Sequence, residues 1–351
     1  MRRPALIYRK EPLFGFDIGT RTAKVMQLGP HAKKTPIIAY GSAEFPEDAI
    51  VEGIVVDPQE IADALLPLLN KDAFGRISAR RIAASLPVAR VFTRVLNLPP
   101  MNPADLGAAV KLEAEQYIPV PLPDLYIDYE IIEQLPEHIE VLMVAAPRAI
   151  IDSYLKLFEI LGLDVALLES SLSAVTRAIL AASPLDQTTL VADFGSASID
   201  LTVHDRVIRL TDTINMGGDD LTRQLATTLE ITHDQAHDIK VKFGLSKSGL
   251  QPKVKAALTA QLDTISAEMR RVIKYYQDRG HEQRPVKTVM LAGGSAGMPG
   301  LVEYLTAQLG IPVTIADPWA GLEFKAVAHV SKHEAPMFTT AIGLARLEGS
   351  L

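Results

Sequence analysis

The stretch FGFDIGTRTAKV, Phe14 to Val25, decides what fold to expect for this chain. Its apolar start predicts a buried strand, residues 18–22 predict a turn, and residues 23–28 predict the returning strand. A glycine in such a turn lets backbone N–H groups approach an anion, and Thr20 adds a hydroxyl donor. The loop is not a Walker A motif, and Asp17 would repel a phosphate placed beside it. The position of this acid has to be explained from elsewhere in the chain.

A near-copy of the stretch occurs in the second half of the sequence, LVADFGSASIDLTV, Leu190 to Val203. Both copies read strand, aspartate, hydrophobe, glycine, small hydroxyl residue, strand. One such turn is ordinary Asp-x-Gly turn chemistry, whereas a matched pair predicts two related sub-domains that face each other. Asp17 and Asp193 then make sense as a pair that holds hydrated Mg²⁺ beside phosphates, because magnesium keeps much of its water and takes one or two carboxylates.

Two further glycine-containing loops each precede a predicted helix, where backbone can lie against a ligand. Neither has the G-x-G-x-x-G spacing of a dinucleotide fold, so that class is not indicated. Lys24, in the first hairpin, either compensates the phosphate charge or lies on the strand edge. The glycines in question are Gly217 with Gly218, and Gly293 with Gly294, the latter followed by Ser295.

Composition excludes several other classes. The 351 residues carry a net charge of −7 and are 48% hydrophobic, which argues for a globular protein and against non-specific nucleic-acid binding. The absence of cysteine excludes disulfides and Cys-ligated zinc. No segment reads as a signal peptide or approaches the ~18–20 apolar residues of a spanning helix. We therefore expect a cytoplasmic protein whose membrane contact is indirect.

Several single elements are also predicted. Asp57 and Pro58 read as the N-cap and first residue of a helix that Pro67 bends or shortens. Residues 254–278 show the three- and four-residue spacing of a long amphipathic helix. Trp319, the one tryptophan, is expected in the core rather than beside a ligand.

Between the two hairpins, the chain reads as a strand–helix–strand–strand–helix–strand unit, a compact α+β insert. We therefore expect two lobes with an insert between them. The predicted boundaries are residues 11–85, 168–188 and 330–351 for lobe I, 86–167 for the insert, and 189–329 for lobe II.

This order of motifs resembles the actin, sugar-kinase and Hsp70 nucleotide-binding superfamily, and the position of the insert resembles its FtsA branch. The phrases LPPM, EAEQYIP, DYEII, VAAPRAIID and APMFTTAIGLARL resemble the type IV pilus assembly protein PilM family, over roughly Phe14 to Leu347. The resemblance implies an α/β, actin/Hsp70-like (ribonuclease H-like) two-lobed fold with an FtsA-type α+β insert.

The resemblance also implies ATP and Mg²⁺ as ligands, with Asp17 and Asp193 as the metal residues. Glu169, before the connecting helix, is the candidate catalytic acid. Ser170 and Ser171 follow it where a second acid would be expected, so at most a weak ATPase is implied. The residues assigned to the nucleotide are Gly19, Thr20, Arg21, Thr22, Lys24, Gly195, Ser196, Ser198, Gly217, Gly218, Lys240, Gly293, Gly294 and Ser295.

For function, the resemblance implies an ATP-binding scaffold of the inner-membrane assembly platform of a type IV pilus or type II-like secretion system. Such a scaffold binds the short cytoplasmic amino-terminal tail of a PilN-like single-pass membrane protein, and it reaches the membrane through that partner. Apolar residues of the insert either contact the tail or belong to the core. They are Leu98, Met101, Ala109, Val110 and Tyr117.

Two alternatives stay open. A small-molecule kinase of the same superfamily would need a substrate-domain aspartate, and no sugar-kinase motif is evident. An FtsA-like filament protein would end in a linker and an amphipathic helix, whereas this sequence ends ARLEGSL, which favours the scaffold. The pair His233 and His237 has metal-binding spacing but no evident third ligand, so a solvated helix face is expected.

Overall fold

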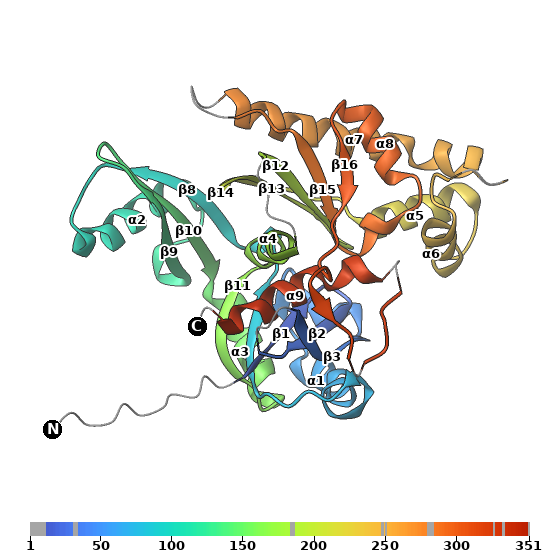
Figure 1. Ribbon diagram of the computed structural model, residues 1–351, viewed down its shortest axis with the longest axis horizontal. Helices are drawn as coiled ribbons and strands as arrows, with labels where there is room; N and C mark the ends of the chain where they lie inside the picture. The colour runs from blue at the N-terminus through green and yellow to red at the C-terminus, as the bar shows by residue number, and fades with distance from the viewer. Residues whose placement is uncertain are drawn as a thin grey trace.

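The computed structural model describes residues 12–30, 34–182, 187–246, 249, 251–278, 284–325, 327–331 and 334–349. Two helix-covered sheets lie one above the other, and a smaller sheet projects to one side (Figure 1). Within the described ranges, no helix has both the length and the apolar character needed to cross a bilayer.

The first sheet contains the opening stretch at its centre, with the strand order β11-β7-β1-β2-β3-β17 and β6 paired to β3. Its strands β1, β7 and β11 are parallel, so their carboxyl ends lie at one edge. The strands are β1 (Leu13–Ile18), β2 (Thr22–Leu28), β3 (Thr35–Glu44), β6 (Phe74–Gly75), β7 (Arg81–Leu86), β11 (Asp164–Ser170) and β17 (Leu322–Glu323).

Strand β1 is buried on both faces, which explains why its sequence is apolar apart from Asp17 near its carboxyl end. Phe14 and Phe16 point to a core formed with α1 (Pro58–Pro67) and α3 (Arg148–Ile160). On the opposite face, a Cβ built on Gly15 would lie 2.2 Å from the carbonyl oxygen of Ala341 in α9 (Thr339–Ala345). Glycine therefore lets α9 pack directly on the strand.

The predicted helix start at Asp57 is confirmed. Asp57 Oδ1 accepts a hydrogen bond from the Glu60 backbone N–H at 2.9 Å, and Pro58 occupies the first helical position. The α-helix ends at Pro67 and continues into a π-helical turn, Leu68–Asp72. A short hairpin, β4 (Ile50–Val51) with β5 (Ile54–Val55), precedes it.

The second sheet repeats the theme with the strand order β14-β13-β12-β15-β16. Its strands are β12 (Thr189–Phe194), β13 (Ile199–Asp205), β14 (Val207–Ile214), β15 (Thr288–Ala292) and β16 (Val313–Ile315). Its helices are α5 (Gly218–Leu229), α6 (His233–Lys242), α7 (Gln251–Asp278) and α8 (Leu301–Leu309). The predicted long helix is thus confirmed as α7, which buries Leu258, Leu262 and Ile265 in the core of this sheet.

The smaller sheet belongs to the insert and has the order β8-β10-β9, covered by α2 (Pro103–Tyr117). Its strands are β8 (Phe92–Leu98), β9 (Leu125–Gln134) and β10 (Ile139–Pro147). Leu98 and Val110 are buried in the core between helix and sheet, whereas Tyr117 is 47% exposed. Met101 and Ala109 are partly buried against the same core.

The predicted insert also included the helix and strand now seen as α3 and β11. In the structure, β11 pairs with β7 of the first sheet, and Tyr154, Leu157 and Phe158 of α3 are buried in the core beneath Phe16. The apolar face of α3 is covered by the first sheet and by α1, which supply Phe14, Phe16, Ile61 and Leu65 to the same core. The division into two lobes and an insert stays a prediction, with this helix and strand packed on the side of lobe I.

Helices α4 (Ser171–Ala182) and α9 cross each other at the centre of Figure 1, between the two large sheets. A Cβ built on Gly343 would lie 1.8 Å from the carbonyl oxygen of Ala174, so the two backbones touch. The chain passes between the sheets twice, from α4 to β12 and from β16 to β17. Trp319, on the second passage, is 7% exposed and packs with Tyr40, as expected of a core residue.

Candidate functional site

The two hairpins have the same turn geometry and meet at their tips. In the first, the Gly19 N–H donates to Thr22 O at 2.9 Å, and in the second the Gly195 N–H donates to Ser198 O at 3.0 Å. The hydroxyls of Thr20 and Ser196 share a hydrogen bond of 2.7 Å. The structure thus brings together turns that are 176 residues apart in the sequence.

Asp17 lies at the carboxyl end of β1, only 9% exposed. Its Oδ1 accepts a hydrogen bond of 2.7 Å from Ser85 Oγ at the end of β7. Its Oδ2 lies 3.6 Å from the Lys24 ammonium, opposite it in the hairpin register. Arg21, at the turn, lies 3.9 Å from Asp219 of the other half of the molecule. The first hairpin therefore presents a fixed carboxylate paired with Lys24, and a second cation, Arg21, at its turn.

The second hairpin carries two acids at the same level. Asp193 pairs with Asp200 in the register, at the position that Lys24 occupies in the first hairpin. Burial is the largest cause that raises the pKa of Asp193 to about 7; the negative charges of Asp200 and Asp17 act in the same direction, and the positive charge of Lys24 opposes them. Burial also raises the pKa of Asp200 to about 6, although a hydrogen bond of 2.9 Å from Thr213 Oγ1 favours its charged form.

The Gly217-Gly218 turn rests on the backbone of the second hairpin. The Gly218 N–H donates to Gly195 O at 2.9 Å, and a Cβ built on Gly217 would lie 2.2 Å from Ser196 O. A Cβ on Gly218 would lie 2.0 Å from Ser295 Oγ. A residue with a Cβ at either position would collide with these atoms, so glycine allows the turn to pack this closely on the second hairpin and on Ser295.

The loop after β15 closes the same region. Gly293 has φ of 84°, and a Cβ built on it would lie 2.3 Å from Asp193 Oδ1. Glycine is required here both by the left-handed backbone and by the neighbouring carboxylate. A Cβ on Gly294 would meet nothing closer than Met337, at 3.7 Å. The structure therefore brings both predicted glycine loops to the second hairpin.

Lys240 of α6 lies behind the Gly217-Gly218 turn and is 4% exposed. Its ammonium donates to Gly218 O at 2.6 Å and to Thr222 Oγ1 at 2.7 Å. Burial lowers the pKa of Lys240 to about 8. The side chain thus supports the turn from inside, and its assignment to the nucleotide stays a prediction.

Glu169 at the end of β11 is bound on both carboxylate oxygens. Arg177 of α4 donates to each at 2.7 Å, and the same guanidinium donates to Gly343 O of α9 at 2.9 Å. This arrangement ties β11 to the two crossing helices. The catalytic assignment of Glu169 stays a prediction. Both carboxylate oxygens of this residue already accept hydrogen bonds from Arg177.

The donor set fits a hydrated divalent cation. No cluster of three or more potential protein ligands occurs among the residues that the structure describes. Asp17 and Asp193 come instead from opposite hairpins, and the charge of Asp17 helps to raise the pKa of Asp193, an effect that a cation between them would oppose. A site with two carboxylates and several waters is the arrangement that Mg²⁺ accepts.

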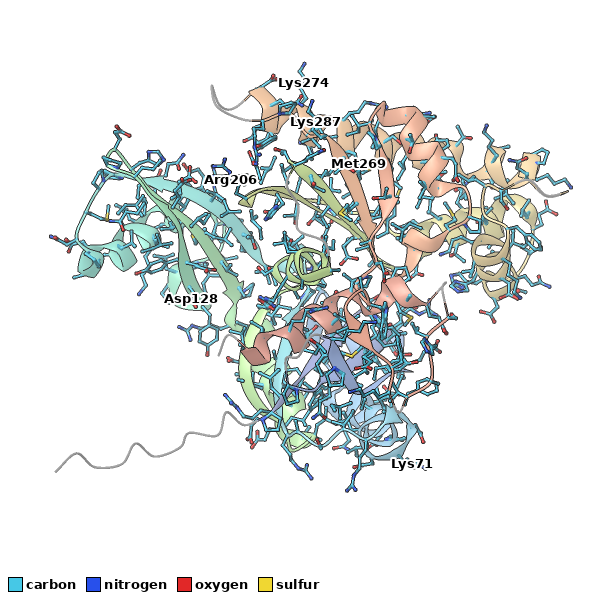
Figure 2. The ribbon with its side chains drawn as sticks, viewed as in Figure 1. Lys71, Asp128, Arg206, Met269, Lys274 and Lys287 are labelled. Carbon is cyan, nitrogen blue, oxygen red and sulfur yellow. The ribbon has the colours of Figure 1, made fainter. Side chains whose placement is uncertain are left out.

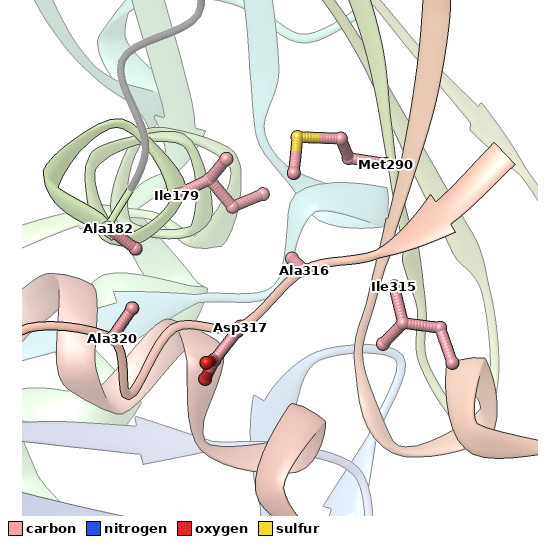
Figure 3. Close-up of a pocket in the computed structure, with 7 residues that line it drawn as sticks. All are labelled: Ile179, Ala182, Met290, Ile315, Ala316, Asp317 and Ala320. Carbon is pink, nitrogen blue, oxygen red and sulfur yellow. The ribbon is translucent and has the colours of Figure 1, made fainter. Parts of the chain in front are cut away.

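A separate apolar cavity of about 210 Å³ lies where α4 meets the edge of the second sheet (Figure 3). Its lining residues are Ile179, Ala182, Met290, Ile315, Ala316, Asp317 and Ala320. None of the predicted nucleotide residues belongs to it. The candidate site is therefore defined by the converging hairpins and glycine loops rather than by this cavity.

Comparison with known proteins supplies the family. A sequence model of the family described as type IV pilus assembly protein PilM matches residues 15–348. The chain belongs to the PilM family. The prediction from the quoted phrases is therefore confirmed, and the match extends over nearly the whole chain.

Individual relatives of this PilM family member share about a quarter of its sequence or less. It is 23% identical over 362 residues to the cell division protein FtsA of Streptococcus pneumoniae, covering 90% of this chain and 78% of that protein. The solved structure of a PilM-PilN type IV pilus biogenesis complex superposes with a TM-score of 0.84 at 23% identity, covering 97% of this chain and 99% of the other. MreB 5 of Spiroplasma citri gives a TM-score of 0.57 at 11% identity, covering 97% and 96%. The predicted actin-like α/β fold is confirmed.

Sequence reasoning missed residues that hold this site in place in the PilM family member. Ser85 holds Asp17, Thr213 holds Asp200, and Arg177 holds Glu169. The signal for Ser85 is a polar residue at the end of an otherwise apolar strand. Thr213 stands in a mostly polar run, RLTDT, directly after the second hairpin, which is only a weak signal for a strand.

Proposed function

We propose that this chain is an ATP-binding, actin-like scaffold of a type IV pilus or type II-like inner-membrane assembly platform, and that it binds the cytoplasmic tail of a PilN-like membrane protein. The observation that carries the proposal is the convergence of the two hairpins, where Thr20 meets Ser196, with two glycine loops around the second of them. Membership of the PilM family supplies the assembly context.

In this proposal the phosphates of ATP lie between the hairpin tips. The backbone N–H groups and hydroxyls of the turns face them, and Lys24 and Arg21 supply positive charge. Asp17 and Asp193 hold Mg²⁺, which neutralises charge on the phosphates when bound. The nucleoside lies beside Gly293 and Gly294, in the loop that follows β15. A related fold, MreB 5 of Spiroplasma citri, has been solved bound to AMPPNP, which supports nucleotide binding by this fold.

Hydrolysis is expected to be weak. A general base has to accept a proton from water, yet both oxygens of Glu169 accept hydrogen bonds from Arg177. Ser170 and Ser171 beside it are not acids. ATP then serves to set the relative angle of the two halves rather than to be consumed rapidly, because a ligand that contacts both halves favours the closed arrangement.

The partner is proposed from the PilM-PilN complex whose PilM fold this chain shares. The tail would lie on the insert and its border with lobe I, and the chain would stay cytoplasmic, held at the inner membrane by the anchor of the partner. Of the predicted contact residues, Leu98 and Val110 are core, which leaves Met101, Ala109 and Tyr117 accessible to a tail.

Calorimetric titration of the full chain with Mg–ATP tests the nucleotide site. Asp17→Ala and Asp193→Ala are expected to weaken binding at least tenfold while the fold stays intact by circular dichroism. Asp105→Ala, in the first turn of α2 on the insert, is the matched control and should bind as wild type. Unchanged affinity in both site variants would rule out the assignment. A synthetic PilN-like tail titrated into the full chain tests the partner, and absence of binding would count against the scaffold.

An FtsA-like filament protein is the second candidate, favoured by the curated relatives, which are FtsA proteins. Sedimentation with and without Mg–ATP distinguishes the two. A scaffold remains a small, defined species, whereas a filament protein pellets in a nucleotide-dependent manner.

A further inference from the structure

Strand β14 carries polar residues at every second position on one face. Arg209, Thr211 and Thr213 alternate along the strand, so their side chains share a face at a spacing of ~7 Å. Leu210 and Ile214, on the opposite face of the strand, pack into the core of the second sheet. The polar face is thus turned away from that core.

At one end of this face, the side chains form hydrogen bonds with the insert. Arg209 donates to Glu133 Oε2 of β9 at 3.1 Å and to Glu140 Oε2 of β10, and Thr211 Oγ1 donates to Thr93 O of β8 at 3.2 Å. The Arg209 and Glu140 side chains are 23% and 16% exposed, so the bridge is screened less than an open surface pair. Figure 1 shows β14 beside β8, and Figure 2 marks this end of the strand with Arg206.

The other end of the same face reaches the candidate site. Thr213 Oγ1 donates to Asp200 Oδ1 at 2.9 Å, and Asp200 lies opposite Asp193 in the hairpin. One strand therefore connects a carboxylate pair of the site with a carboxylate pair of the insert. A short, rigid element with contacts at both ends can transmit a displacement between them.

The chain connections show which parts of the molecule the contact between Arg209 and the insert joins. The insert leaves and rejoins the chain on the side of the first sheet, since β7 precedes β8 and β10 runs directly into α3. Strand β14 belongs to the second sheet. Any rotation of one large sheet against the other has to keep, shift or break the contact between Arg209 and Glu140.

We propose that Arg209 is a latch through which occupancy of the hairpin site sets the position of the insert, and with it the grip on a partner bound there. The inference rests on the proposed function and adds a way in which nucleotide binding would regulate partner binding. With the latch made, the insert is held to both halves of the molecule. With the latch broken, the insert is held only through its connections to the first sheet. Because coupling is reciprocal, a partner that favours one state of the insert changes nucleotide affinity by the same factor.

Hydrogen–deuterium exchange of the full chain tests the latch in wild type, Arg209→Ala and Glu140→Gln, each with and without Mg–ATP. Without nucleotide, both variants are expected to exchange about fivefold faster in β8 and β10, the order for losing one partly buried ion pair. In wild type, Mg–ATP changes exchange in these strands at least about twofold. In Arg209→Ala, Mg–ATP still binds but the response in the insert is lost.

Arg270→Ala is the matched control. This arginine lies on α7 of the same half of the molecule and donates to Gln308 O at 2.7 Å, so its removal should leave both the exchange and the response of the insert as in wild type. Arg209→Lys covers the case in which Arg209→Ala does not fold, because it keeps the charge but cannot bridge two carboxylates in the same fork.

The outcomes separate the latch from the proposed function. If wild type binds Mg–ATP and the insert responds equally in Arg209→Ala and Glu140→Gln, the latch is overturned while the nucleotide site stands. If wild type does not bind Mg–ATP, the proposed function fails, and nucleotide control of the latch fails with it. In that case, faster exchange of β8 in the nucleotide-free variants still supports the bridge as the contact that holds the insert, and unchanged exchange overturns that too.

Discussion

The crowding of acids at the second hairpin predicts that the protein becomes more stable when one of them loses its charge. The pKa of Asp193 is raised from 3.8 to about 7. A shift of about 3 units corresponds to roughly 4 kcal/mol at 1.36 kcal/mol per unit, which coupling to Asp200 and partial exposure reduce. We expect Asp193→Asn to raise the free energy of unfolding by roughly 2–4 kcal/mol at pH 8.

The pH dependence carries the sign of the effect. Because the folded protein disfavours the charged form of Asp193, the cost is absent below pH 3.8, develops between pH 3.8 and about 7, and is complete above about 7. The advantage of Asp193→Asn over wild type should therefore shrink to less than half at pH 5. Urea denaturation in EDTA at pH 8 and pH 5 measures both values.

A control and a refutation follow from the same physics. Asp238→Asn removes an exposed acid of α6 whose pKa is lowered by its hydrogen bond and ion pair with Lys242, so it should not stabilise the protein. If Asp193→Asn gives no advantage at pH 8, or the same advantage at pH 5, the electrostatic reasoning is refuted. Mg–ATP should stabilise wild type and leave Asp193→Asn unchanged, because the variant lacks the charge that the metal would neutralise.

Three further predictions concern single contacts. Gly343→Ala should lower thermal stability by at least ~2–3 kcal/mol or prevent folding, because its Cβ would overlap the carbonyl oxygen of Ala174; an unaltered melting curve would contradict the helix crossing. Burial lowers the pKa of Lys240, so the free energy of unfolding of wild type should increase as pH rises from about 8 to 10.5, and this increase should be absent in Lys240→Met. Denaturation at pH 7.5 and 10 measures the change for both proteins, and an equal change in both would refute the burial effect. Ser85→Ala should weaken Mg–ATP binding several-fold in calorimetry and leave binding of ATP in EDTA unchanged, because it frees Asp17; equal losses in both titrations would disprove the link to the metal.

Elements with strong local signals are predictable from the sequence. The two hairpins, the capped helix at Asp57 and the long helix α7 follow from turn chemistry, capping and apolar periodicity within one segment. The glycine loops are predictable for the same reason, because each glycine pair precedes a predicted helix in the sequence. The structure explains the glycines, since a Cβ at Gly293 or Gly217 would collide with the second hairpin. Each of these signals is complete within a few residues.

The contacts between segments are not predictable in this way. The packing of α3 on the first sheet rather than on the insert depends on long-range contacts with Phe14, Phe16 and Leu65, which the apolar pattern of α3 alone does not specify. The partner of Glu169 is an arginine on the following helix, and the partner of Asp17 is a serine on a strand far along the chain. Strand β14 was absent from the prediction, because its mixed polar run is weak strand evidence until the neighbouring insert gives the polar face its partners.

The apolar cavity of Figure 3 gains a meaning from its place in the chain path. Ile179 and Ala182 come from the end of α4 and Ala316 to Ala320 from the segment after β16, so both passages between the large sheets border it. Packed interiors resist compression, and a joint without free space would have to unpack side chains in order to turn. If the two large sheets turned against each other, the cavity would give these side chains room to shift, and an apolar molecule bound there would oppose that movement.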